Sequence, residues 1–180
     1  MTGPAYDVLG SSWDMTTLPP GPLTELYAYW QSRRGSRPLP LRRDIDPLDI
    51  PRLLQYLLLI EIERLKPMRI RFRLAGTNFR QFYGRDLTGL IRDEAELKTD
   101  GPERGLAAMM ADWREVLQRG EPRWANVRQA VGRDGMDVVR FTGLALPLSR
   151  DGQSKQGQAA DMLLLGTVYH PDEAASGGAA

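Results

Sequence analysis

The sequence of 180 residues contains no cysteine and a single histidine, His170. Without cysteine the chain cannot form disulfides, thiolate zinc sites, iron–sulfur clusters or cysteine nucleophiles. With one imidazole it cannot build a site that needs two histidines, such as the paired-histidine helix of metalloproteases. The sequence therefore predicts no metal site and no thiol chemistry.

Long hydrophobic runs and an excess of one charge are also missing. The longest apolar run, Tyr56 to Ile60, is far shorter than the ~20 residues that span a bilayer. The N-terminal residues lack the basic start and the apolar core of a signal peptide. Lys and Arg number 24 and Asp and Glu 23, so the net charge of +1 gives no reason to expect nucleic acid. We therefore predict a cytoplasmic protein without a membrane segment.

The first part of the chain predicts a leader followed by a helix. Residues 1–21 end in Leu18-Pro19-Pro20-Gly21, which cannot continue regular structure, and we expect them to form a flexible leader. Apolar residues then recur at helical spacing from Pro22 to Arg34, with Gly35 directly after them. This pattern predicts an amphipathic helix over residues 22–34.

The rest of the chain predicts five strands and one long helix. The strands are expected at Tyr56–Glu63, Met68–Gly76, Trp124–Val131, Val138–Leu148 and Met162–Tyr169. The long helix is expected to be capped by Asp100 and to end at Gly120. Short helical segments are expected at 48–54, 78–84 and 88–97, and a disordered tail at 171–180.

This order of elements indicates an α+β fold in a single domain of residues 22–170. We expect a five-stranded antiparallel sheet with the short helices and the long helix on one face, plus the N-terminal amphipathic helix. That arrangement is typical of PAS domains.

Three stretches of sequence strengthen the likeness. They are Asp44-Ile45-Asp46-Pro47-Leu48-Asp49-Ile50-Pro51, the stretch Arg73-Leu74-Ala75-Gly76-Thr77 with Tyr83-Gly84-Arg85-Asp86-Leu87-Thr88-Gly89, and Leu146-Pro147-Leu148-Ser149-Arg150-Asp151-Gly152. In this order they resemble the small stand-alone PAS-like proteins of proteobacteria, over about Pro22 to His170. Gly143 departs from the family pattern, because a basic residue is usual there. The resemblance implies a sensory or regulatory module in signalling, with no catalysis.

The resemblance also implies a small pocket between the sheet and the helices. The residues expected to line it are Tyr56, Phe72, Phe79, Tyr83, Met109, Trp113, Arg128 and Phe141. Aromatic and methionine residues at helical spacing are more often ordinary core than pocket lining, although methionine suits adaptable pockets. An arginine that pointed inward could bind a carboxylate or phosphate, but the sequence does not decide which face Arg140 takes.

A second set of apolar residues is expected on the outer face of the sheet, where another element must pack against them. Leu57 and Leu59 point away from the face that meets the long helix, so they need a partner. The helix of residues 22–34 can supply it, within one chain or across a homodimer, and the resemblance favours the homodimer. The interface residues expected are Leu23, Leu26, Tyr27, Trp30, Leu57 and Leu59.

Several cofactors of PAS proteins do not suit this sequence. The flavin adduct of light-oxygen-voltage sensors and the thiol-linked chromophore of photoactive yellow protein both need a cysteine. Heme is not favoured, because the long helix has no histidine and His170 lies at the end of the last strand. The identity of any small-molecule ligand stays open.

One stretch of the sequence is strongly basic, and two other functions are alternatives to the sensory one. From Arg64 to Arg85 there are seven basic residues and no acid, but no nucleic-acid motif accompanies them. A charged interface with a protein or with the acidic C-terminal tail is the favoured interpretation. One alternative function is a cone-shaped small-molecule enzyme of the nuclear-transport-factor-2-like type. Another is a structural adaptor with an empty pocket, acting only through a protein partner.

Overall fold

The structure, a computed structural model, describes residues 6–97, 104–131, 137–153 and 158–170. The predicted helix cap at Asp100 and the predicted tail at 171–180 lie outside these ranges.

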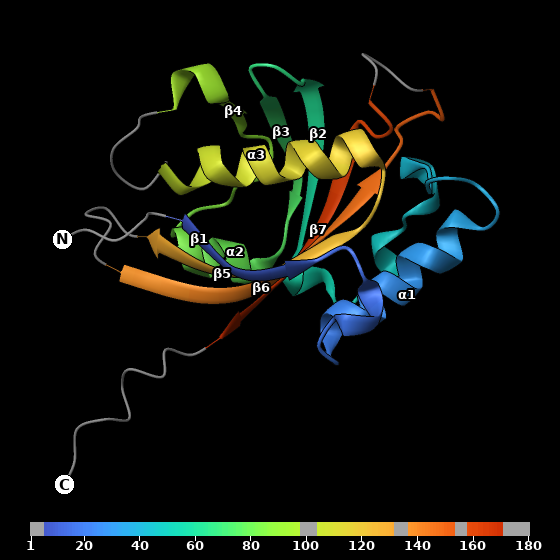
Figure 1. Cartoon of the computed structure of the whole chain (residues 1–180), viewed down its shortest axis with the longest axis horizontal. Coiled ribbons are helices and arrows are strands. Elements are labelled where there is room, and N and C mark those ends of the chain that lie inside the picture. Colours follow the sequence, from blue (N-terminus) through green and yellow to red (C-terminus); the bar gives the residue numbers. More distant parts are fainter. Residues whose placement is uncertain (1–5, 98–103, 132–136, 154–157, 171–180) are drawn as a thin grey trace, which may run out of the picture.

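Seven strands form one antiparallel sheet in the order β1-β5-β6-β7-β2-β3-β4 (Figure 1). Their bounds are β1 Tyr6–Ser12, β2 Leu57–Arg64, β3 Arg69–Ala75, β4 Ile91–Asp93, β5 Arg123–Val131, β6 Asp137–Leu148 and β7 Met162–His170. The five predicted strands are the five in the middle of the sheet. The predicted count was too low because a short strand extends the sheet at each edge.

Strand β1 replaces part of the predicted flexible leader. It pairs with β5 from Tyr6 opposite Gln129 to Ser12 opposite Trp124, with a bulge between Val8 and Gly10. This segment of seven residues is largely polar, so its sequence pattern does not predict a strand. The unpaired edge of β5 supplies the hydrogen-bonding partners, and pairing follows from tertiary context rather than from propensity.

The described helices are α1 Pro22–Arg34, α2 Thr77–Tyr83 and α3 Arg104–Arg119, and none of them is long and apolar enough to cross a membrane. Helix α1 has the predicted bounds. The predicted short helix over 48–54 is absent, and two single turns of 3₁₀ helix, Pro47–Asp49 and Leu54–Tyr56, take its place. Pro51 explains the break, because a proline disfavours helical geometry at the residue before it.

Helices cover the two faces of the sheet separately. On the inner face lies α3, whose Trp113, Val116 and Leu117 are buried against the core, and α2 adds Phe79 (Figure 1). On the outer face lies α1, which contacts β6 and β7. The sheet therefore has an inner layer built from α2 and α3 and an outer layer built from α1.

Helix α1 fits the outer face closely at a glycine. A Cβ added to Gly166 on β7 would lie 2.7 Å from Cδ2 of both Leu23 and Leu26. The indole Nε1 of Trp30 donates a hydrogen bond to the carbonyl oxygen of Pro147 at 2.9 Å. Leu57 on β2 is in register with Gly166, and its side chain is 3% exposed. Of the two arrangements that the sequence allowed, the structure shows the helix covering the sheet of its own chain.

Charged residues occupy the other end of the outer face. On β3, Arg69 and Arg71 alternate with the buried Ile70 and Phe72, as predicted. Both arginines bond to Glu63, at 3.0 Å and 2.7 Å. Further ion pairs here join Arg64 and Arg69 to Asp93 and Arg73 to Glu61. Much of the basic stretch is therefore paired with acids of the same chain.

Replacing Gly166 by alanine should destabilise the fold, because the new methyl group would overlap Leu23 and Leu26. We expect a loss of about 1–3 kcal/mol in the free energy of unfolding, measured by denaturant titration. Gly143→Ala is the matched control, since its Cβ would lie 3.4 Å from the ring of Phe141 and meet nothing nearer. Equal losses in the two variants would contradict the close fit of α1.

Acid should weaken the fold through Glu94. Burial alone would raise the pKa of Glu94, but bonds from the backbone N–H of Met68 and from Arg114, both 2.6 Å, hold it below its ordinary value of 4.5. A carboxyl group whose pKa is lower in the folded than in the unfolded protein stabilises the fold above the unfolded pKa. This stabilisation is lost as the pH falls through the pKa of the folded protein. We expect Glu94→Gln to lose less stability than the wild type between about pH 6 and about pH 3 in denaturant titrations. An identical loss would show that Glu94 contributes nothing.

Candidate functional site

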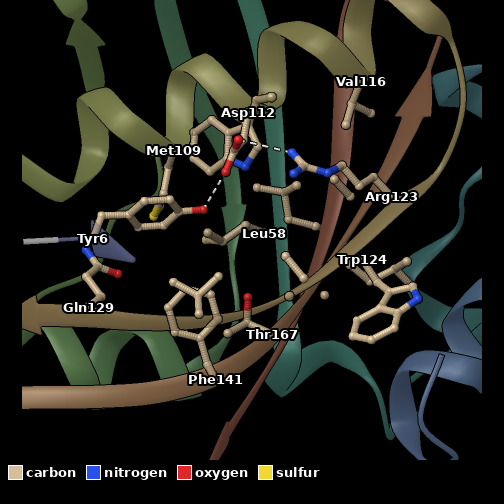
Figure 2. A pocket seen from close by; sticks show the side chains of 18 of the residues that line it. Tyr6, Leu58, Met109, Asp112, Val116, Arg123, Trp124, Gln129, Phe141 and Thr167 are labelled. Carbon is tan, nitrogen blue, oxygen red and sulfur yellow. Dashed lines mark hydrogen bonds and ion pairs between the residues drawn. The ribbon is translucent and has the colours of Figure 1, made fainter. Parts of the chain in front are cut away.

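Three small residues lie in one row on the inner face of the sheet and leave a hollow there. Ala125 on β5 is in register with Gly143 on β6, which is in register with Thr167 on β7. Residues in one row of an antiparallel sheet point to the same face. All three line a cavity of about 80 Å³ between the sheet and α3 (Figure 2). The space therefore comes from the register of three strands rather than from one residue.

Larger side chains wall this cavity. The next row of the sheet holds Val127, Phe141 and Tyr169. The rings of Phe141 and Tyr169 meet edge to face at 5.9 Å, and Phe79 of α2 meets Tyr169 at 6.1 Å. Helix α3 contributes Met109, Asp112, Trp113 and Val116, and β2 contributes Leu58. Most of the surface is apolar, as in small-molecule sites generally.

A polar wall closes one side of the cavity. The hydroxyl of Tyr6 donates to Oδ2 of Asp112 at 2.8 Å, and Nη1 of Arg123 lies 3.0 Å from Oδ1 of the same carboxylate (Figure 2). Nη2 of Arg123 donates to Oγ of Ser11 at 3.1 Å. These contacts join β1, α3 and β5, which are far apart in the sequence. The edge strand is therefore tied directly to the wall of the cavity.

The tyrosines around the cavity stay protonated. Burial raises the pKa of Tyr6, and its hydrogen bond to the carboxylate of Asp112 raises it further. Burial also raises the pKa of Tyr169. Both phenols are therefore neutral hydrogen-bonding groups at physiological pH, and neither brings a negative charge to the site.

Five of the predicted pocket residues do line the cavity: Phe79, Tyr83, Met109, Trp113 and Phe141. The other three lie elsewhere. Tyr56 ends the 3₁₀ turn before β2, and Phe72, a residue of β3, is buried in the core. Arg128 is exposed on the outer face, because it is opposite Arg140 while the neighbouring pair, Val127 and Phe141, faces inward. Arg140 takes the outer face as well.

Sequence reasoning missed the polar members of the site. They are Tyr6, Asp112, Arg123, Gln129 and Thr167. For Gln129 a signal was available, because strand alternation places it on the same face as Ala125 and Val127. For Tyr6 there was none, since its segment gave no indication of a strand.

The cavity does not suit the larger cofactors. Its volume is about half the ~150 Å³ of an engineered cavity that binds benzene, so a heme or flavin ring system does not fit into it as it stands. His170 is exposed and bonds to the hydroxyl of Thr142 at 2.7 Å, away from the cavity. Within the described ranges no three His, Asp or Glu side chains are grouped so that they could hold a metal ion.

Removing the hydroxyl of Tyr6 should loosen β1. Tyr6→Phe keeps the ring but removes the donor to a charged acceptor, so we expect a loss of about 1.5 kcal/mol in the free energy of unfolding and faster amide hydrogen exchange in β1. Tyr27→Phe is the control, because the bond that Tyr27 accepts from Gln31 is exposed. If both variants behaved alike, the contact between Tyr6 and Asp112 would not hold the strand.

Comparison with known families agrees with this architecture. Residues 19–158 match a family model described as PAS domain. The match begins just before α1 and ends before β7, so it leaves out Tyr6 and Thr167, although both line the cavity. No curated protein matches the chain. Because the matched residues make up well over half of the sequence, the chain belongs to the PAS domain family.

Proposed function

We propose that this protein is a cytoplasmic PAS-type sensor that binds a small molecule in the cavity between α3 and the sheet and passes its occupancy to a signalling protein. PAS domains are, in general, sensory modules of signalling. The observation that carries the proposal is the row of Ala125, Gly143 and Thr167, which leaves space where larger side chains would have filled the core. A well-packed interior has few such spaces, so a cavity walled by convergent polar groups favours binding.

The polar wall offers a route from the cavity to the surface. Tyr6 and Asp112 both line the cavity, and Tyr6 belongs to the edge strand β1. A molecule that shifted Asp112 would change the hydrogen bond that holds β1 to α3. Edge strands carry unpaired backbone groups, so a change at β1 alters a surface that another protein can contact.

An enzyme of the cone-shaped type is the less favoured reading. Such an enzyme needs an interior acid or base that is free to exchange a proton. Asp112 is the carboxylate among the lining residues, and both of its oxygens already hold a partner, Tyr6 and Arg123. This arrangement favours a binding role for Asp112.

The homodimer implied by the PAS resemblance stays a prediction. Of the expected interface residues, Tyr27 is half-buried and stacks on Trp30 at 6.1 Å, while the other five are buried within the chain. A dimer of this fold would therefore use surfaces other than the contact between α1 and the sheet.

A side chain that fills the cavity should abolish ligand binding without destabilising the fold. Gly143→Val places a branched side chain in the hollow, so we expect it to abolish binding while raising the free energy of unfolding by at least about 0.5 kcal/mol, because glycine weakens a strand. Native and then denaturing mass spectrometry of the purified protein would detect a released small molecule, and the native mass would report the dimer.

Gly10→Val is the matched control, because Gly10 lies in strand β1 and a Cβ there would meet nothing within 4 Å. We expect the wild type and Gly10→Val to release the same small molecule and Gly143→Val to release none. If no form of the protein released a molecule, or if Gly143→Val released it in the same amount, the sensor proposal would be wrong and the ligand-free adaptor would replace it.

A further inference from the structure

One hydroxyl group points into the cavity without a hydrogen-bond partner. Thr167 on β7 is 7% exposed and lines the cavity, and Figure 2 shows its hydroxyl directed inward. Within the described ranges no residue makes a hydrogen bond to this group. Nε of Arg123 also has no partner, but protein atoms cover it completely, whereas Oγ1 of Thr167 faces the open space of the cavity. A molecule in the cavity can therefore reach Thr167.

The register of the sheet explains why this hydroxyl has no neighbour to bond. Thr167 is opposite Gly143 on β6, which has no side chain. On its other side β2 begins only at Leu57, which is opposite Gly166. Leu165 precedes Thr167 by two residues on the same face of β7, and it is apolar. The side chains of these neighbours offer neither a donor nor an acceptor.

The polar wall of the cavity is already engaged in hydrogen bonds of its own. Tyr6 and Arg123 each hold one oxygen of Asp112, and Gln129 bonds to the phenol of Tyr83. A buried water typically makes about three hydrogen bonds, so one hydroxyl among apolar side chains holds a water poorly. A hydroxyl buried without a partner costs free energy, and a molecule that brings the partner recovers it.

Charge and size narrow the class of molecule. Among the described lining residues the charged side chains are Asp112 and Arg123, which pair at 3.0 Å, so an ionic ligand would find no unpaired counter-charge. The volume of about 80 Å³ admits only a few non-hydrogen atoms, since a cavity of ~150 Å³ holds a benzene molecule. The site therefore favours a small neutral molecule with an apolar body and one polar group.

We infer that Thr167 anchors a small alcohol in this cavity, with the apolar part of the molecule beside Ala125 and Gly143 and its hydroxyl bonded to Oγ1 of Thr167. A ligand hydroxyl both donates and accepts, so it complements Thr167 in either direction, whereas a ketone can only accept. This inference rests on the proposed function, because it assigns the class of molecule that the sensor binds. Thr167 is then a specificity-determining residue, and it lies outside the residues that match the PAS family.

Three probes of similar size test this contact. Isopropanol carries the hydroxyl, isobutane replaces it by a methyl group, and isopropylammonium replaces it by a charged group. Each would be titrated into the full, isotope-labelled chain while NMR follows the backbone amide signals of Ala125 and Gly143. Valine has nearly the shape of threonine but no hydroxyl, so we expect Thr167→Val to bind isopropanol about tenfold more weakly than the wild type does. Its affinity for isobutane should not fall, and the wild type should bind isopropylammonium more weakly than isopropanol.

Two further variants serve as matched controls. Thr167→Ser keeps the hydroxyl, so it should keep most of the affinity for isopropanol. Thr142→Val removes a hydroxyl from the neighbouring strand β6, where it bonds to Asn126 away from the cavity, so both affinities should stay unchanged. Without ligand, Thr142→Val should lower the urea midpoint of unfolding because it breaks this bond, whereas Thr167→Val should not, because its hydroxyl has no partner in the protein.

The outcomes distinguish the inference from the proposed function. If Thr167→Val lost isopropanol and isobutane equally, or lost neither, Thr167 would not contact the ligand hydroxyl, and the inference would be overturned while a ligand-binding cavity remained. Tighter binding of isopropylammonium than of isopropanol, or a urea midpoint lowered as much in Thr167→Val as in Thr142→Val, would overturn it as well. If no probe moved the signals of Ala125 and Gly143 in the wild type, the binding function itself would fail.

Discussion

The antiparallel register of β5, β6 and β7 is the constraint on which the rest of this structure depends. It places Ala125, Gly143 and Thr167 in one inward row, and the larger Val127, Phe141 and Tyr169 in the next. A shift of one residue would turn each strand over and carry these side chains to the outer face. The same register that hollows the interior also directs Arg128 and Arg140 outward.

The two faces of the sheet respond to this register in opposite ways. On the inner face α3 stands above the short row and leaves a cavity, whereas on the outer face α1 closes onto Gly166 so tightly that no Cβ would fit. Glycine therefore has two roles on neighbouring strands. Gly166 permits close packing of a helix, and Gly143 leaves part of the inner face open as cavity.

The edge strand β1 connects the cavity to the periphery of the fold. Its Tyr6 reaches Asp112 on α3, and Asp112 is paired with Arg123 on β5, so three elements meet in one hydrogen-bonded group. The residues that match the PAS family begin after this strand. The polar wall thus combines residues inside the matched region with one from outside it.

The sequence by itself determined the order of the central elements, because each follows from local patterning. The bounds of α1 and the alternation of Ile70 and Phe72 with Arg69 and Arg71 are examples. Tertiary structure alone decided the strand at Tyr6–Ser12 and the meeting of Tyr6, Asp112 and Arg123. The physical reason is that the pairing of β1 with the free edge of β5, and the contacts of β1 with α3, join residues more than a hundred positions apart, which no local periodicity encodes.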